Sequence, residues 1–146
     1  MKVINGTWLL TLFVVYSHYG FAVDLEATVH SINSKNSEEY RAQVLIENKA
    51  FGCNGGSDIS VGFPEYFQGD KAESAGVSIW ENERLLLDIP SVIVKLDEYL
   101  SIRPFHGIIF CLDDSFLENT TVGISYRKGE FIKSILRIHS LNEFDH

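Results

Sequence analysis

Apolar and polar residues alternate with a period of two along most of the chain beyond its first two dozen residues. The clearest runs are residues 25–29, 40–47, 59–63 and 121–126. Because successive side chains of a strand leave opposite faces of the pleat, this pattern is typical of half-buried strands. In the first run, Val29 falls on the apolar face and His30 on the polar face. The turn-rich residues 33–37 predict a hairpin between the first two runs.

The second half of the chain repeats this pattern. Residues 77–80 and 85–89 flank a polar turn, and residues 121–126 and 131–139 flank another. Each pair therefore predicts a hairpin. Residues 108–112 form a continuous apolar run, which predicts a strand that is buried on both faces.

These signals predict a fold made almost entirely of strands. We count about nine short strands, with turn signals at roughly the 8–12-residue spacing of sandwiches and barrels. We therefore expect a single antiparallel β-sandwich, broadly immunoglobulin-like in architecture, with a disulfide near its core. Trp80 lies between the two cysteines, as in that architecture, but Ile109 stands where its tyrosine would be. The likeness is architectural and implies no function.

Residues 1–22 have the pattern of a cleaved secretory signal peptide. Lys2 is the only charged residue among them, an apolar stretch covers residues 8–16, and small residues precede the cleavage point. A retained anchor is the alternative, but polar residues interrupt a run that would need about 20 predominantly apolar residues to span a membrane. The sequence thus predicts an exported protein, periplasmic or extracellular, with one domain at residues 23–146 and no stable membrane span after cleavage.

The chain is acidic. Its 146 residues carry 20 acidic and 12 basic side chains, for a net charge of -8, and loss of Lys2 with the signal peptide makes this -9. Apolar residues make up 45% of the chain, which is too many for a disordered tail and enough for one core. The acidity argues against nucleic acid, whose binding needs a basic surface. It favours a basic protein partner, because opposite charge raises encounter rates.

Cys53 and Cys111 are the only cysteines. In an oxidising compartment an even count favours pairing, and two cysteines allow one connection. The bridge would close a loop of about 59 residues and stabilise the fold by roughly 4 kcal/mol in the chain-entropy model. Neither a C-x-x-C motif nor a histidine at ligand spacing supports a redox or metal pair, so we expect a structural disulfide.

Signs of catalytic chemistry are few. The histidines beyond residue 22 lie too far apart for a metal-binding pair, and no G-x-S-x-G elbow supports a catalytic serine. We therefore predict no enzymatic activity, no cofactor and no metal. Acidic pairs at residues 97–98 and 113–114, with Asp58, leave a calcium site open, although no EF-hand spacing supports it. Asn119 begins a glycosylation sequon, which matters only in a eukaryotic secretory pathway.

Three functions from different classes fit these features. We favour a small exported acidic binding protein of the inhibitor or immunity type, which binds and blocks a basic protein partner. The alternative is a structural or assembly module of the cell surface, a pilus- or matrix-like subunit with an exposed edge strand. The third is a hydrolase or a calcium-dependent carbohydrate binder, which a pocket lined by histidines or carboxylates would favour. Because aromatic residues are frequent in interface hot spots, the candidate partner-binding residues are Tyr66, Phe67, Tyr99 and Phe105.

Overall fold

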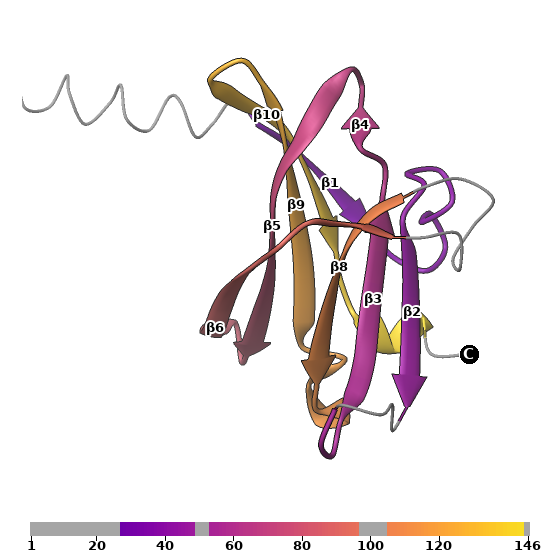
Figure 1. The fold of residues 1–146 in the computed structure, drawn as a ribbon. Coiled ribbons are helices and arrows are strands. Elements are labelled where there is room, and N and C mark those ends of the chain that lie inside the picture. Colours follow the sequence, from indigo (N-terminus) through magenta and orange to yellow (C-terminus); the bar gives the residue numbers. More distant parts are fainter. Residues whose placement is uncertain (1–26, 49–52, 97–104, 145–146) are drawn as a thin grey trace, which may run out of the picture.

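The computed structural model describes residues 27–48, 53–96 and 105–144, which form two β-sheets packed face to face (Figure 1). The six-stranded sheet has the order β1-β10-β9-β5-β4, and β6 also pairs with β5. Its strands are β1 (Thr28–Ile32), β4 (Tyr66–Phe67), β5 (Asp70–Glu81), β6 (Arg84–Ser91), β9 (Thr120–Lys128) and β10 (Phe131–Ile138). The four-stranded sheet has the order β2-β3-β8-β7, with β2 (Gln43–Asn48), β3 (Ser57–Phe63), β7 (Val94–Leu96) and β8 (Phe105–Leu112). Two short 3₁₀ helices complete the described chain, η1 (Asp114–Phe116) and η2 (Leu141–Phe144).

The core lies between the sheets and is filled by alternate residues of the strands. On β9, Val122, Ile124 and Tyr126 are fully buried, and the residues between them face outward. Tyr126 is the largest of the fully buried side chains, and its hydroxyl donates a 2.7 Å hydrogen bond to the Pro64 carbonyl. Burial raises the pKa of this phenol, so it stays protonated and keeps that bond.

The all-β sandwich and its single disulfide are confirmed. So are the two hairpins of the second half, β5–β6 and β9–β10. In the first of them, Asn82 and Glu83 both have positive φ angles, of 48° and 64°. A two-residue loop of this kind matches the twist of the flanking strands and sets the register next to the turn, and the register then shifts by one residue between Ile79 and Trp80.

Three local predictions are wrong. β1 and β2 form no hairpin, because β1 pairs in parallel with β10 while β2 pairs with β3 in the other sheet. The faces of β1 are reversed, since Val29 is exposed and His30 is half-buried. Finally, β8 is enclosed on one face only: Ile108 is fully buried, but Ile109 is 54% exposed.

The disulfide lies on the four-stranded sheet, where Cys53 is buried, at 8% exposed. Cys111 is exposed on β8, and Cys53 precedes β3, the neighbour of β8. Trp80, which an immunoglobulin-like core would bury, is 40% exposed on the other sheet. The architecture is therefore a two-sheet sandwich, and its likeness to an immunoglobulin domain is unconfirmed.

Candidate functional site

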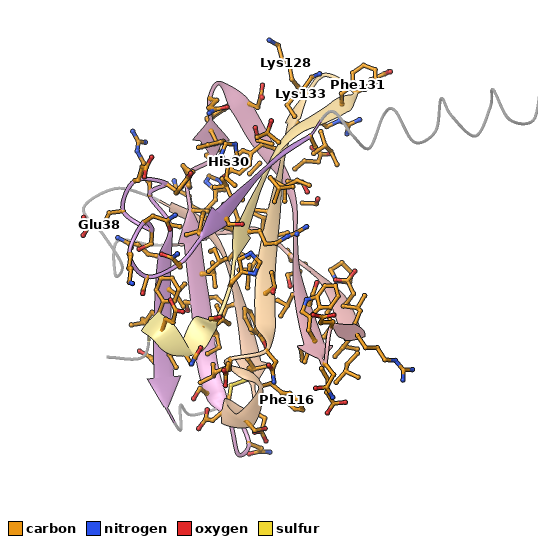
Figure 2. The ribbon with its side chains drawn as sticks, turned by 180° about the vertical axis from the view of Figure 1, so that it is seen from behind. His30, Glu38, Phe116, Lys128, Phe131 and Lys133 are labelled. Carbon is orange, nitrogen blue, oxygen red and sulfur yellow. A yellow bond between two sulfur atoms is a disulfide. The ribbon has the colours of Figure 1, made fainter. Side chains whose placement is uncertain are left out.

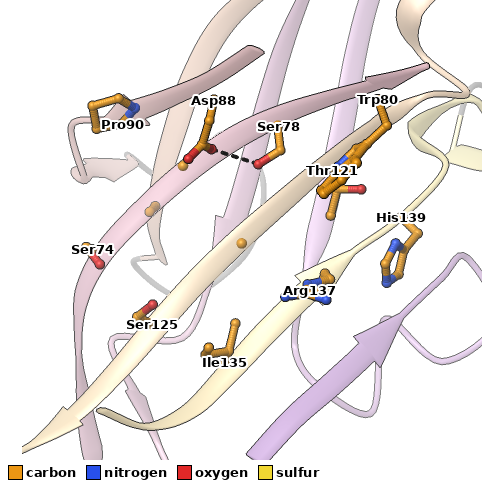
Figure 3. Close-up of a pocket in the computed structure, with 13 residues that line it drawn as sticks. Ser74, Ser78, Trp80, Asp88, Pro90, Thr121, Ser125, Ile135, Arg137 and His139 are labelled. Carbon is orange, nitrogen blue, oxygen red and sulfur yellow. Dashed lines mark hydrogen bonds between the residues drawn. The ribbon is translucent and has the colours of Figure 1, made fainter. Parts of the chain in front are cut away.

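A groove with a volume of about 710 Å³ lies on the outer face of the six-stranded sheet (Figure 3). The residues that line it come from β5, β6, β9 and β10, and from His139, which follows β10. These four strands lie side by side, because β9 pairs with both β5 and β10, and β6 pairs with β5. The groove is therefore a property of the sheet surface, and no loop is needed to form it.

The floor of the groove consists of small residues on the two central strands. The cross-strand partners there are Ser74 with Ser125, Gly76 with Gly123, and Ser78 with Thr121. Half-buried strands ordinarily favour β-branched and aromatic residues, and a glycine within a strand weakens it. The paired glycines leave no side chain above the backbone, so the floor is lowest between them.

Packing explains one of these two glycines and not the other. A Cβ added at Gly76 would lie 3.3 Å from the carbonyl oxygen of Ile89, so the backbone of β6 restricts that position. A Cβ added at Gly123 would meet no atom within 4 Å. The strand would thus accommodate a larger residue at position 123, and the missing side chain there only keeps the groove open.

Larger side chains on the flanking strands form the walls. β6 contributes Pro90, the partner of Gly76, and Asp88. β10 contributes Arg137, the partner of Gly123, and Ile135. One row across the sheet therefore runs from a proline through two glycines to an arginine. In cross-section, the groove has a low centre between two larger side chains.

Trp80, Thr121 and His139 lie together at one end of the groove (Figure 3). Trp80 is held at the end of β5, where its backbone N–H donates a 2.9 Å hydrogen bond to the Asn119 carbonyl. His139 is fixed by its own N–H, which donates a 3.1 Å bond to the Ile32 carbonyl. The groove thus combines one large aromatic surface with several side-chain hydrogen-bonding groups.

Opposite charges stand on opposite walls. Asp88 accepts a 2.8 Å hydrogen bond from the Ser78 hydroxyl, which orients its carboxylate over the floor. Neither of the two ion pairs found in the described part of the chain involves Arg137. Partial burial, and then the charge of Arg137, lowers the pKa of His139. The imidazole is therefore neutral at pH 7, with one nitrogen that donates and one that accepts hydrogen bonds.

Two of the four aromatic residues predicted to bind a partner have described side chains, Tyr66 and Phe67, and neither lines the groove. Tyr66 is 56% exposed on β4, whereas the adjacent Phe67 packs inward, with its ring centroid 5.1 Å from His30 and 5.5 Å from Tyr126. Tyr99 lies outside the described residues, as does the side chain of Phe105, the first residue of β8. A partner-binding role for these four residues stays a prediction.

The other predicted features are placed as follows. Residues 1–22 and the acidic pair at 97–98 lie outside the described residues. Asn119 is exposed between η1 and β9. Asp113 caps η1 by accepting hydrogen bonds from the Ser115 hydroxyl and N–H, which lower its pKa. Within residues 27–48, 53–96 and 105–144, no group of three or more histidine, cysteine or acidic residues is arranged to hold a metal ion.

The sequence analysis did not predict the groove, although a signal for it exists. Both residues 74–78 and residues 121–125 place only serine, glycine or threonine at alternate positions. Such a row on one strand indicates a loosely packed face. Its meaning depends on the second row lying beside it, and the pairing of β5 with β9 joins segments that are far apart in the chain.

No family model, curated protein or solved structure matches this chain. The residues and geometry of the molecule are therefore the basis for any function. In the described part of the chain, no helix is long and apolar enough to cross a membrane.

Proposed function

We propose that this protein binds a carbohydrate chain in the groove of the six-stranded sheet. The observation that carries the proposal is the floor of paired glycines, Gly76 and Gly123, beside an exposed tryptophan and between walls that carry one acidic and one basic side chain. A concave site with an apolar surface and a few convergent polar groups is the usual form of a ligand-binding site.

The groups in the groove suit a sugar. A pyranose ring has C–H faces that pack on an aromatic ring and hydroxyls that need both donors and acceptors. Trp80 offers the aromatic face. Asp88 accepts, Arg137 donates, and the neutral imidazole of His139 does both. Because hydrogen bonds to charged groups are about twice as strong as neutral ones, Asp88 and Arg137 would fix the orientation of the sugar.

A peptide strand fits this site less well than a sugar. Peptides that add to a sheet use the free backbone groups of an edge strand. The floor strands β5 and β9 are each paired on both sides, so their backbone groups are already used. Recognition here must come from side chains. The net charge of -8 also disfavours polyanionic sugars, so a neutral oligosaccharide is the expected class.

Tryptophan fluorescence tests the proposal directly. The chain has two tryptophans, Trp8 and Trp80, so the variant Trp8→Phe retains only the one in the groove. We expect this chain, titrated separately with cellohexaose, chitohexaose and maltohexaose, to show a saturable change with at least one, at a Kd of about 10 µM to 1 mM because the groove is open. Failure of all three sugars to give a saturable signal at 10 mM would refute the proposal.

A matched pair of variants locates the binding site. Gly123→Val fills the floor of the groove and should weaken binding by at least about tenfold, or 1.4 kcal/mol. Ser60→Val places the same valine side chain on the outer face of the other sheet, where Ser60 lies between Leu45 and Ile109, and should leave binding unchanged. Equal binding by the two variants would place the sugar outside the groove.

A second function, binding of a basic protein, is favoured by the distribution of charge. Seven acidic residues lie at one end of the sandwich, in the β5–β6 turn, around η1 and on β2 and β3: Glu47, Asp58, Glu81, Glu83, Asp113, Asp114 and Glu118. Arg84 is the only basic residue described at this end. Phe116 is exposed there, while Lys128 and Lys133 lie at the opposite end (Figure 2). An exposed aromatic residue within an acidic rim suits a cationic partner.

Charge reversal at the two ends tests this second function. The probe is a cationic muramidase, whose turnover of a peptidoglycan substrate is measured with and without the full chain at 20 and 300 mM salt. We expect inhibition at low salt that weakens as charge is screened. Glu118→Lys should reduce it, and Glu130→Lys in the β9–β10 turn at the far end should not. No inhibition at low salt, or equal loss in both variants, would contradict this function.

A further inference from the structure

The long axis of the groove follows the strands (Figure 3). Its floor is a ladder of three pairs of small residues, which begins with Ser74 beside Ser125 and ends with Ser78 beside Thr121. Trp80 follows Ser78 on the same face of β5. Because a strand rises about 3.3 Å per residue, the stretch from Ser74 to Trp80 is about 20 Å long. The groove therefore offers contacts over a distance that several sugar units would fill.

Across the strands the groove is narrow. Its walls on β6 and β10 are three strand spacings apart, which is about 14 Å between their backbones. The wall side chains take up part of this width: the Asp88 carboxylate extends to the Ser78 hydroxyl on β5, at 2.8 Å, and Arg137 lines the other wall. The open floor is thus limited to β5 and β9, so a chain of several sugar units must lie along these two strands.

A groove of this shape favours a straight sugar chain. Strands are extended, so a floor made of two of them is nearly straight over this length. In a β-1,4-linked glucose chain both linking bonds of each ring are equatorial, and the chain is extended. In an α-1,4-linked chain the bond at C1 is axial, and the chain curves into a helix. The shape of the groove therefore discriminates between linkages that the same polar groups would accept.

We infer that the groove takes a straight, β-1,4-linked neutral oligosaccharide, which lies along β5 and β9 and contacts the protein through about four sugar units. This inference rests on the proposed function and specifies its ligand. Each unit of such a chain advances roughly 5 Å, or about one and a half strand residues, so a length of 20 Å holds about four units. Beyond Ser125 the small residues end, and the ion pair of Arg127 with Glu73 follows on the same two strands.

The contacts differ from one end of the groove to the other. Trp80 and His139 lie at one end, Arg137 lies beside the middle of the floor, and Ile135 lies beside the other end (Figure 3). The aromatic surface and most of the charged or hydrogen-bonding groups of the walls are therefore within reach of the units nearest Trp80. A short sugar should bind at this end, where tryptophan fluorescence reports it, and longer chains should extend toward Ser125.

Two glucose chains of equal length test the linkage. Maltohexaose is the matched control for cellohexaose, because both contain six glucose units and differ in linkage alone. In fluorescence titrations of the Trp8→Phe chain, we expect the tighter of cellohexaose and chitohexaose to bind at least about tenfold more tightly than maltohexaose. Equal affinities, or binding of maltohexaose alone, would overturn the inference and leave the proposed function in place. If none of the three binds, both fail.

Chain length tests the orientation. Across the tighter β-1,4-linked series, affinity should rise at least about tenfold from two to four units and change by less than about twofold from four to six. Ser125→Val fills the floor at the end away from Trp80 and should reduce the gain from two to four units to below about threefold. Ser60→Val, on the outer face of the other sheet, should keep the full gain. No gain beyond two units, or a gain that Ser125→Val leaves intact, would overturn the orientation while sugar binding itself stands.

Discussion

The outer faces of the two sheets differ although both are open to solvent. On the four-stranded sheet one row runs Leu45, Ser60 and Ile109, and the disulfide Cys53–Cys111 ties the chain across the same sheet. On the six-stranded sheet the corresponding rows contain only serine, glycine and threonine on the central strands. The first face also pairs two glycines, Gly62 with Gly107, but both are buried, so that face is filled and covalently tied, whereas the other is hollow.

This difference predicts that stability and the proposed sugar binding depend on different sheets. Apolar residues on the filled face shield the backbone ladder beneath them, and the disulfide limits the unfolded chain. The hollow face gives up both advantages, since glycine in a strand costs roughly 0.5–1 kcal/mol relative to alanine. The four-stranded sheet should therefore carry stability with no effect on binding, and the six-stranded sheet should show the reverse.

The disulfide gives the largest test of this division. Replacing both Cys53 and Cys111 with alanine should cost about 2–4 kcal/mol, because the bond closes a long loop, and should lower the Tm by roughly 10–15 °C. Below the transition, sugar binding in the groove should be unchanged. If the double variant does not fold, wild-type chain with and without reductant at low temperature provides the same comparison. If the reduced but folded chain lost sugar binding, the assignment of stability to one sheet and binding to the other would be wrong.

On the hollow face, Gly123→Val should raise stability and abolish binding, whereas loss of the disulfide should lower stability and leave binding unchanged. Its side chain would enter open space, and a β-branched residue favours the strand conformation. We expect a gain of up to about 1 kcal/mol, seen as a rise in Tm of roughly 4 °C by calorimetry, with loss of binding. Such opposite changes in stability and function are common where a site is kept for a ligand.

Gly76→Val is the control for this variant. Its side chain would also enter the groove, but its Cβ approaches the Ile89 carbonyl, so it should lower the Tm. If Gly123→Val were as destabilising as Gly76→Val, then the glycine at position 123 would be explained by packing and the hollow face would need no functional reason.

The sequence predicted what depends on near neighbours. The hairpins β5–β6 and β9–β10 could be predicted because their turn residues are adjacent in the sequence. The disulfide could be predicted because the chain has only two cysteines. The supposed hairpin of β1 and β2 failed because residues 33–37 show a turn but not which sheet the next strand joins. The sequence analysis placed His30 in solvent because histidine is polar. In the fold it packs against the ring of Phe67, which comes from a distant segment that local sequence does not identify as a neighbour.

The groove could not be predicted from the sequence, because it depends on contacts between strands that are far apart in the chain. Its floor needs β5 beside β9, and its walls need β6 and β10 beside them. Each strand alone reads as an ordinary alternating run. Only the pairing of Gly76 with Gly123 places these two glycines together on the floor of the groove.

The smallest expected effect is a pH dependence that belongs to the hollow face. His139 has a pKa below its ordinary value in the fold, because burial and then Arg137 disfavour its charged form. The unfolded chain therefore takes up this proton first as the pH falls. The contribution of His139 to stability is complete above about pH 6.5, the ordinary pKa of histidine, and is lost as the pH falls through the pKa of His139 in the folded state.

The variant His139→Gln removes this pH dependence, so the Tm of wild type relative to His139→Gln should be lower at pH 5 than at pH 8. Arg137→Gln removes the second cause and should reduce the dependence without abolishing it. If His139→Gln kept the same relative Tm at both pH values, the rim of the groove would not perturb this histidine, and the neutral imidazole assigned to sugar binding would lose its support.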